Sequence, residues 1–238
     1  ILFTCLPMPD TCETVYFGEN GIVQGMRPGL IVVETSTVSP ELNRKQAEAI
    51  EARGGSFLDA PLSGGPMGAE AGTLTIMCGG KKEVFDKALP VLQAMGKVIE
   101  LVGPVGSGSV VKLINNMLVG IHTVALSEAF VMGAKAGIDP AIIHKILKVS
   151  TGHSAMIDRT IDLIQDRDFK QRFMVDLLLK DMRLALELAK QLGVDAETAA
   201  LSEKAIAEVS QMGYGKQDVA AIIRRQEEKA GVEVRRKV

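Results

Sequence analysis

The chain has 238 residues, of which 47% are hydrophobic, enough to build a sizeable core in one large or two modest domains. This composition excludes an intrinsically disordered protein. Lys and Arg number 27 against 29 Asp and Glu, so the formal net charge is −2 and no basic excess favours nucleic acid as a partner. The longest nearly uncharged apolar stretch, Met117 to Ser127, is too short to span a bilayer, and we expect a soluble protein with no membrane partner.

Cysteine usage indicates a reducing compartment. Cys5, Cys12 and Cys78 are an odd number with no Cys-x-x-Cys spacing, and no signal peptide accompanies them. We therefore expect a cytoplasmic protein. The chain opens on an apolar run of strand length without an initiator Met, so its N-terminus looks like the middle of a domain.

Two kinds of periodicity divide the chain, with the change near Gly103-Pro104. Before it, β-rich runs alternate with helical segments, which predicts a parallel or mixed sheet. The expected strands are 1–6, 30–34, 56–59, 73–77 and 98–102, and the expected helices between them are 9–16, 40–53 and 82–95. From Ser107 onward the pattern is helical, with expected helices at 107–136, 140–148, 154–165, 173–192, 196–212 and 217–229.

Four positions give local signals for helix ends. Ser39 and Asp139 are good N-caps, and each precedes a Pro suited to the first helical position, which predicts helix starts there. Gly137 and Gly193 follow helical patterns where a left-handed C-terminal residue is needed.

Small or polar residues follow the apolar runs at three places: Leu6-Pro7, Thr35-Ser36-Thr37 and Pro61–Gly65. In open α/β sheets, ligands bind outside the carboxyl ends of the strands. These loops are therefore candidate sites, although they could also be ordinary turns. Ser63-Gly64-Gly65 is the most informative, because two adjacent glycines can present successive N–H groups to an anion, and Ser63 adds a hydroxyl donor. A small carboxylate would fit there.

The predicted helix from Ser107 to Ala136 is apolar in nearly every direction, which predicts a helix buried in the centre of the molecule. Against this background, Lys112, Asn116, Thr123 and Ser127 form a polar stripe. Burial disfavours a charged Lys and lowers its pKa, so Lys112 could act as a general acid/base, with Asn116 orienting the amine. Alternatively, Lys112 reaches solvent from the first turn of the helix.

Two other features carry little chemistry by themselves. Residues 103–108 read G-x-x-G-x-G, which is neither the dinucleotide fingerprint nor a phosphate loop, so we expect a flexible seam and a helix start. Asp176 with Lys180 and Arg183 with Glu187 are i,i+4 pairs typical of a solvated helix face, so Lys180 and Asp181 by themselves support no functional role. No cluster of His, Cys, Asp and Glu has metal-ligand spacing, and we predict no metal.

Several motifs together resemble the β-hydroxyacid dehydrogenase family, the group of 3-hydroxyisobutyrate dehydrogenase and tartronate semialdehyde reductase. They cover nearly the whole chain, in order: Asp59-Ala60-Pro61-Leu62-Ser63-Gly64-Gly65, Gly72-Thr73-Leu74-Thr75-Ile76-Met77, Gly106-x-Gly108-x-x-x-Lys112-x-x-Asn115-Asn116, Leu179-Lys180-Asp181 and Gly213-Tyr214-Gly215-x-x-Asp218. The 6-phosphogluconate dehydrogenases carry His-Asn-Gly where this chain has Ile114-Asn115-Asn116, which disfavours a sugar phosphate.

The resemblance implies an NAD(P)-dependent oxidoreductase acting on a small carboxylate-bearing 3-hydroxy acid or semialdehyde, of the 3-hydroxyisobutyrate, glycerate/tartronate semialdehyde or 4-hydroxybutyrate type. It implies an α/β fold, with an incomplete Rossmann-type sheet domain at 1–105 and an all-α substrate and oligomerisation domain at 106–238, built on a long central helix. The implied site residues fall into three groups: catalytic Lys112 and Asn116; substrate-binding Ser63, Gly64, Gly65, Lys180 and Asp181; and cofactor-binding Leu6, Pro7, Thr37 and Lys180.

The main departure from the family is the absence of G-x-G-x-x-G from this sequence. Two βαβ-type units, roughly 60 residues, would supply it, so the chain is expected to be a fragment. The competing hypothesis is a non-catalytic homologue that acts as a binding or oligomerisation module. The Met- and Leu-rich helical half suggests a homo-oligomer. The tail, residues 232–238, is expected to be a solvated end.

Overall fold

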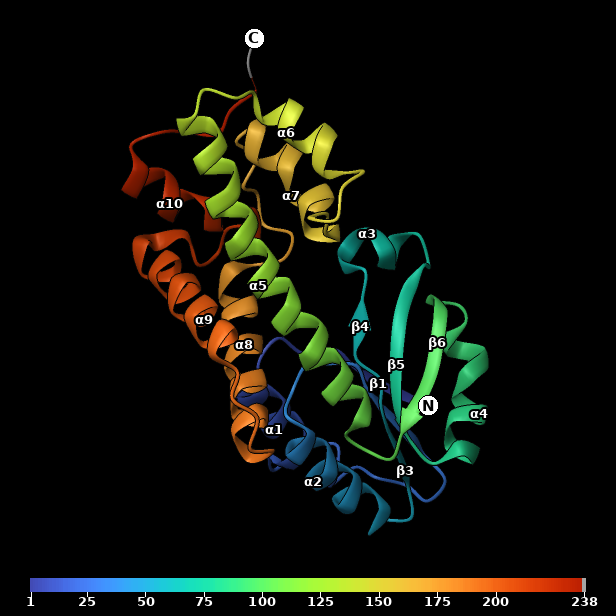
Figure 1. Cartoon of the computed structure of the whole chain (residues 1–238). Helices are drawn as coiled ribbons and strands as arrows, with labels where there is room; N and C mark the ends of the chain where they lie inside the picture. Colours follow the sequence, from blue (N-terminus) through green and yellow to red (C-terminus); the bar gives the residue numbers. More distant parts are fainter. Residues whose placement is uncertain (237–238) are drawn as a thin grey trace. The chain divides into compact units, whose positions relative to one another are not determined.

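The structure is a computed structural model that describes residues 1–236. Its contacts divide the chain into two compact units, Ile1–Asn115 and Asn116–Val238, and the boundary falls within one long helix. The first unit is built on a sheet and the second is helical (Figure 1).

The sheet unit alternates strands and helices along the chain. Its strands are β1 (Leu2–Thr4), β2 (Ile31–Glu34), β3 (Ser56–Asp59), β4 (Leu62–Ser63), β5 (Leu74–Gly80) and β6 (Gly96–Gly103). Its helices are α1 (Pro9–Phe17), α2 (Pro40–Glu51), α3 (Gly65–Glu70), α4 (Lys82–Leu92) and the start of α5 (Ser107–Lys135).

The sheet is mixed, which is one of the two arrangements, parallel or mixed, that the sequence pattern predicted. β1, β2 and β3 are parallel neighbours, with Val32 opposite Leu2 and Phe57. β5 pairs with β3 and β4 in antiparallel fashion and with β6 in parallel. The parallel β1 and β2 therefore bring the loops at residues 5–7 and 35–37 to one edge of the sheet.

Alternating residues of the strands face opposite layers of helices, as the pleat requires. Val33 and Leu58 belong to a core cluster with α4, whereas Val32 and Phe57 belong to one with Tyr16 of α1 and with residues of α2. Figure 1 shows α4 and α2 on different sides of these strands. Strands buried on both faces read as continuous apolar runs, which explains why β2 lacks a polar alternation.

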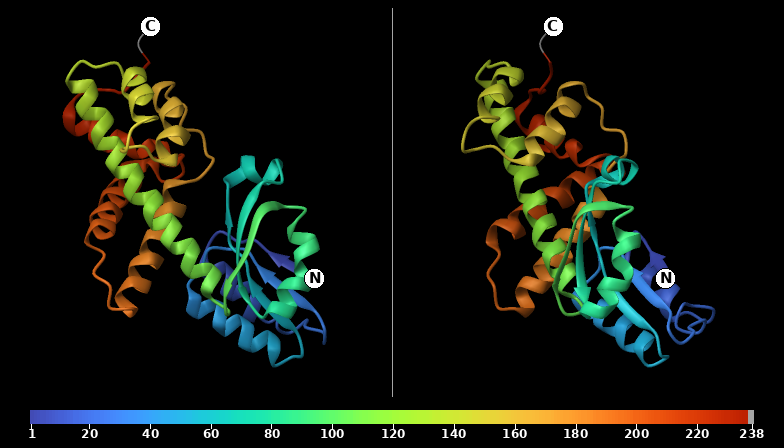
Figure 2. Two further views of the ribbon diagram at one scale, coloured as in Figure 1. Left: turned by 45° about the vertical axis from the view of Figure 1, so that its right-hand side comes forward. Right: turned by 90° about the vertical axis from the view of Figure 1, so that its right-hand side faces the viewer.

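The helical unit packs its helices around the C-terminal half of α5 (Figure 2). They are α6 (Pro140–Leu147), α7 (Ala155–Gln165), α8 (Val175–Gln191), α9 (Glu197–Val209), the π-helical turn η1 (Ser210–Tyr214), the 3₁₀ turn η2 (Val219–Ile222) and α10 (Ile223–Ala230). Phe130 of α5, Ile161 of α7, Met182 of α8 and Ile206 of α9 are fully buried in this core.

The helix-end predictions are confirmed. Ser39 Oγ accepts a 3.2 Å bond from Leu42 N, and Asp139 Oδ1 accepts a 2.9 Å bond from Ala141 N. Gly137 and Gly193 have φ of 80° and 67°, the left-handed conformation that ends a helix.

Several sequence-based expectations of structure were wrong. The segment after Ser63 is not a plain loop but leads directly into α3, and the expected helix at 217–229 starts as the 3₁₀ turn η2. The tail expected to be solvated contains Val234, which is fully buried and donates its N–H to Glu227 Oε1 at 2.8 Å. Lys237 of that tail lies outside the described residues.

The apolar composition of α5 had suggested a helix buried on every side, but the structure shows that parts of it are exposed. Ile114 is 48% exposed, Leu118 44% and Met132 71%. By length and hydropathy α5 could cross a membrane. However, Lys112, Asn116, Thr123 and Ser127 are all buried within the protein, an arrangement expected of a core helix in a soluble protein.

Candidate active site

The start of α5 is fixed by a buried carboxylate from β3. Asp59 Oδ1 accepts a 2.7 Å bond from Gly106 N, and Asp59 Oδ2 accepts a 3.0 Å bond from Ser109 N. Backbone N–H groups at a helix start have no partner within the helix, so this carboxylate caps α5. Burial raises the pKa of Asp59 to about 6, although these N–H donors act in the opposite direction.

Lys112 follows this anchored turn by one turn of helix. It is 9% exposed, so the alternative in which its side chain extends into solvent does not hold. Asn116 lies one further turn along α5 and is 2% exposed. Both side chains therefore lie in the protein interior, as the polar-stripe interpretation required.

Asn116 is held by α8 within the helical unit. Its Nδ2 donates a 2.6 Å hydrogen bond to Asp181 Oδ2, and Asp181 is 2% exposed. Asp181 Oδ1 lies 2.9 Å from Lys180 Nζ, an ion pair without the angle of a hydrogen bond. A carboxylate only accepts hydrogen bonds, so Asp181 fixes which end of the Asn116 amide is the donor.

The loops predicted to line the cofactor lie together at the carboxyl edge of β1 and β2. Leu6 N donates a 2.7 Å bond to Ser36 Oγ, which ties the two loops to each other. Pro7 is exposed and Thr37 is half-buried. The parallel pairing of β1 with β2 is the physical reason that residues 30 positions apart meet here.

Ser63, Gly64 and Gly65 form a third group, on β4 and the start of α3. Gly64 has φ of 130° and Gly65 of 60°, conformations that residues with a side chain rarely adopt. Both glycines are exposed and Ser63 is half-buried. These backbone angles are consistent with an anion-binding turn, whose N–H groups would face a carboxylate.

The sequence did not assign a role to two buried carboxylates. Asp59 begins the Asp59–Gly65 motif, and Glu34 ends the apolar run of β2. Both are fully buried and hydrogen-bonded. An acidic residue that ends an apolar strand is the signal that could have found them. Residues 103–108, expected to be a flexible seam, are instead anchored through Gly106 N.

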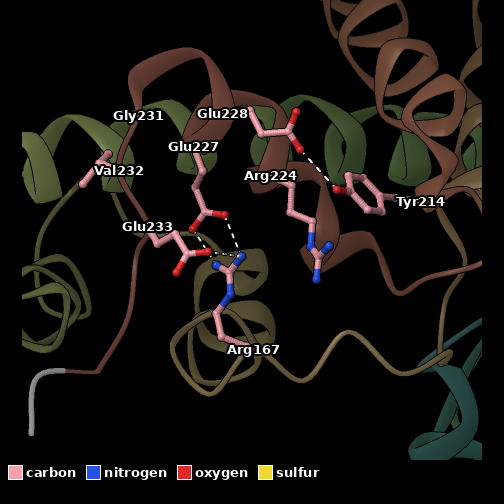
Figure 3. A pocket seen from close by; sticks show the side chains of 8 residues that line it. All are labelled: Arg167, Tyr214, Arg224, Glu227, Glu228, Gly231, Val232 and Glu233. Atoms are coloured by element: carbon pink, nitrogen blue, oxygen red, sulfur yellow. Dashed lines mark hydrogen bonds and ion pairs between the residues drawn. The ribbon is translucent and has the colours of Figure 1, made fainter.

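A cavity of about 460 Å³ lies elsewhere in the helical unit (Figure 3). None of the predicted site residues lines it. Arg167 forms a bidentate pair with the buried Glu227, and Arg224 stacks over the rings of Phe169 and Tyr214 at 4.5 Å. Within residues 1–236, no group of three or more His, Cys, Asp or Glu side chains is arranged to hold a metal ion.

Two family models match the chain. The model for the NAD-binding domain of 6-phosphogluconate dehydrogenase matches residues 1–103. The model described as NAD-binding of NADP-dependent 3-hydroxyisobutyrate dehydrogenase matches residues 106–226.

Known proteins match over nearly the whole chain. The 2-(hydroxymethyl)glutarate dehydrogenase of Eubacterium barkeri is 39% identical over 98% of this chain and 78% of its own length. The 2-hydroxy-3-oxopropionate reductase of Escherichia coli is 34% identical over 94% of this chain and 76% of its own. A crystal structure of 3-hydroxyisobutyrate dehydrogenase from Salmonella typhimurium is 31% identical, with a TM-score of 0.87, over 94% of this chain and 78% of that one.

A mixed Rossmann-type sheet joined to a helical domain by a long helix with a buried lysine defines an NAD(P)-dependent oxidoreductase. The matches place this chain in the β-hydroxyacid dehydrogenase family. The predicted fold class, enzyme class and NAD or NADP cofactor are thereby confirmed.

Proposed function

We propose that the chain acts on a small 3-hydroxy acid or its semialdehyde, and that Lys112 is the acid/base of the reaction. The observation that carries this proposal is the burial of Lys112 one helical turn before Asn116, whose amide is fixed by Asp181. The relatives are named for substrates of this kind, 2-(hydroxymethyl)glutarate and 2-hydroxy-3-oxopropionate. The proposed types are 3-hydroxyisobutyrate, glycerate/tartronate semialdehyde and 4-hydroxybutyrate.

The cofactor, when bound, exchanges a hydride with the carbon that bears the hydroxyl group. In the oxidative direction, Lys112 Nζ accepts the hydroxyl proton, and in the reductive direction it returns that proton. Asn116 presents its oxygen, because its nitrogen is committed to Asp181. A neutral amide oxygen of this kind orients the amine of Lys112 in either protonation state.

Binding and orientation fall to the other predicted residues. Ser63, Gly64 and Gly65 would hold the substrate carboxylate, so that the carbinol hydrogen faces the cofactor. The family resemblance also assigns Lys180 and Asp181, an ion pair on α8, to the substrate. Leu6, Pro7 and Thr37 fit the cofactor because Pro7 is exposed and the other two are half-buried at the carboxyl edge of the sheet.

The test is a Lys112→Ala variant assayed for hydride transfer with NADH and NADPH against a panel of small semialdehydes. General acid/base catalysis contributes about 10²–10⁴-fold, so we expect kcat to fall by at least that lower factor. Lys45→Ala, which removes an exposed lysine paired with Glu13, should leave kcat unchanged. Retention of more than about a tenth of wild-type kcat by Lys112→Ala contradicts the proposed role.

The second candidate is a binding or oligomerisation module without catalysis. Saturable binding of NADH or NADPH to the 238-residue chain would argue against this candidate. No binding at millimolar cofactor would favour it.

We also propose that the chain is a cytoplasmic homo-oligomer with domains at 1–105 and 106–238. An apolar stripe on and beside α6, made of Ile138, Ile142, Ile146 and Val149, is 47–85% exposed. Contiguous exposed apolar residues mark interaction surfaces, and a second copy of this chain is the proposed occupant. Light scattering should show a smaller particle for Ile142→Glu/Ile146→Glu than for the wild type; equal masses contradict this interface.

A further inference from the structure

Buried polar side chains form a continuous hydrogen-bonded path through the sheet unit. The path starts at the loops that end β1 and β2 and finishes in the first turn of α5. Its side chains are at most 4% exposed: Ser36, Glu34, Gln46, Asn43, Ser109 and Asp59. Buried polar groups are costly unless they are satisfied, so such a path imposes one arrangement on the elements that it joins.

The first half of the path holds the loops at the sheet edge. Leu6 N donates to Ser36 Oγ at 2.7 Å, and Ser36 N donates to Glu34 Oε1 at 2.7 Å. Glu34 Oε2 accepts from Gln46 Nε2 of α2 at 3.4 Å. One carboxylate therefore holds the loop that contains Thr37 and, through Ser36, the loop that contains Leu6.

The second half reaches α5 through two residues on one face of α2. Asn43 Nδ2 donates to Gln46 Oε1 at 3.3 Å, and Ser109 Oγ donates to Asn43 Oδ1 at 2.5 Å. Ser109 also donates its backbone N–H to Asp59. Ser109 lies three residues before Lys112, in the turn of α5 that presents the lysine.

The charge of Glu34 decides the direction of every bond between these amides. A carboxylate only accepts, so Gln46 must turn its nitrogen towards Glu34 and its oxygen towards Asn43. Asn43 must then turn its nitrogen towards Gln46 and its oxygen towards Ser109, whose hydroxyl must donate. A change of donor or acceptor at either end of the path therefore alters the hydrogen bonds at the other end.

We propose that Glu34 is a positioning residue that sets the cofactor loops in register with the turn of α5 that carries Lys112. This inference rests on the proposed function, because Leu6, Thr37 and Lys112 are the groups that it aligns. A misplacement of about 1 Å between reacting groups can cost about 100-fold in rate, so a rigid link between these elements has a direct catalytic consequence.

The test reverses the direction of the hydrogen bonds along the path. In Asn43→Asp, two acceptor-only carboxylates flank Gln46, which can donate to only one of them. We expect the cofactor KM to rise and kcat to fall, each by about 10-fold, the effect of one frustrated buried hydrogen bond. In the double variant Glu34→Gln/Asn43→Asp, the carboxylate sits at the other end, and Gln46 turns round and satisfies both neighbours. We expect it to return KM and kcat to within about 3-fold of wild type.

The single variant Glu34→Gln separates positioning from a role of the charge itself. The new amide keeps its oxygen towards Ser36 N and turns its nitrogen towards Gln46. Gln46 and Asn43 can then reverse, with Ser109 Oγ accepting, so we expect a change of less than about 3-fold. The proposal is overturned if the Asn43→Asp protein keeps wild-type KM and kcat while a cooperative thermal transition shows that it is folded. It is also overturned if Glu34→Gln fails to improve a folded Asn43→Asp protein.

Amide hydrogen exchange tests the same link without substrate or cofactor. Ser109→Ala removes the hydroxyl donor at α5, and we expect the amides of Leu6 and Ser36 to exchange about 10-fold faster. Thr160→Val is the matched control, since the fully buried Thr160 hydroxyl bonds Met156 O of its own helix. Equal protection of Leu6 and Ser36 in Ser109→Ala and the wild type overturns the link. A wild-type chain without hydride transfer overturns the proposed function instead, and the exchange result still decides the link.

Discussion

Asn116 of α5 and Asp181 of α8 are 65 positions apart and share a hydrogen bond of 2.6 Å in the interior of the helical unit. The bond is short, as hydrogen bonds to carboxylates are, and it holds the Asn116 amide with its nitrogen towards Asp181. The sequence predicted Asn116 as a catalytic residue and Asp181 as a substrate-binding residue, and this bond couples the two side chains.

Replacement of Asp181 should therefore impair catalysis through Asn116. In Asp181→Asn, the acceptor for Asn116 Nδ2 is uncharged and Lys180 loses its ion pair. We expect kcat to fall by about 10-fold or more, on the scale of about 1.5–3 kcal/mol for a hydrogen bond to a charged group. Steady-state kinetics measure it, with the exposed Asp195→Asn as control. An unchanged kcat in Asp181→Asn shows that Asn116 does not need this partner.

The buried Asp59 should make stability depend on pH. Its pKa rises from 3.8 to about 6 on folding, so the folded state binds this proton more tightly. The contribution is fully present below pH 3.8 and is lost as pH rises through 6, and a shift of about two units corresponds to about 3 kcal/mol.

Urea unfolding of the wild type and Asp59→Asn at intervals between pH 4 and 7 isolates this contribution, because the other titrating groups are common to both proteins. The difference between the two free energies of unfolding should change by about 2 kcal/mol across that range, since part of the full effect falls below pH 4. A pH-independent difference contradicts a raised pKa for Asp59.

Gly108 is required for the approach of α5 to the sheet. A Cβ at this position would lie 2.2 Å from Met77 O and 2.8 Å from Asp59 Oδ2, and the first of these atoms is backbone that cannot move aside easily. We expect Gly108→Ala to destabilise the protein by about 3 kcal/mol or more. Gly25→Ala, whose Cβ meets nothing closer than 3.8 Å, is the control. Equal thermal midpoints for the two variants would show that the contact relaxes without cost.

Arg167 should be essential to the helical unit although it lies outside the proposed active site. It donates two hydrogen bonds to Glu227, which is 4% exposed, and its guanidinium stacks on Phe169. Removal of one partner of a buried pair costs about 3–5 kcal/mol, which we expect for Arg167→Ala.

The control for this prediction is Arg44→Ala, which removes an exposed pair with Glu41 and should cost less than about 1 kcal/mol. Equilibrium unfolding in urea compares the two variants. Similar losses would mean that Glu227 finds another donor or takes up a proton.

Local signals in the sequence were sufficient for most elements. Ser39-Pro40 and Asp139-Pro140 start helices where expected, because a capping side chain and a proline act within one turn. Ser56–Asp59 was predicted with its observed bounds. The short β4 and α3 were missed, since two and six residues contain too little periodicity to be recognised.

The site divides in the same way between local and long-range causes. By itself, the sequence determined that Lys112 and Asn116 share a face of one helix, because four residues make about one turn. It also determined, through motifs that lie in order along the chain, the family and the cofactor class. Only the tertiary structure decided that Asp181 holds Asn116, that Asp59 caps α5, and that Glu34 is linked to Ser109. The bonds that make these contacts join residues 47 to 66 positions apart, and the link from Glu34 to Ser109 runs through several side chains in series. Sequence periodicity reports only neighbours along one element, whereas these bonds depend on how separate elements pack.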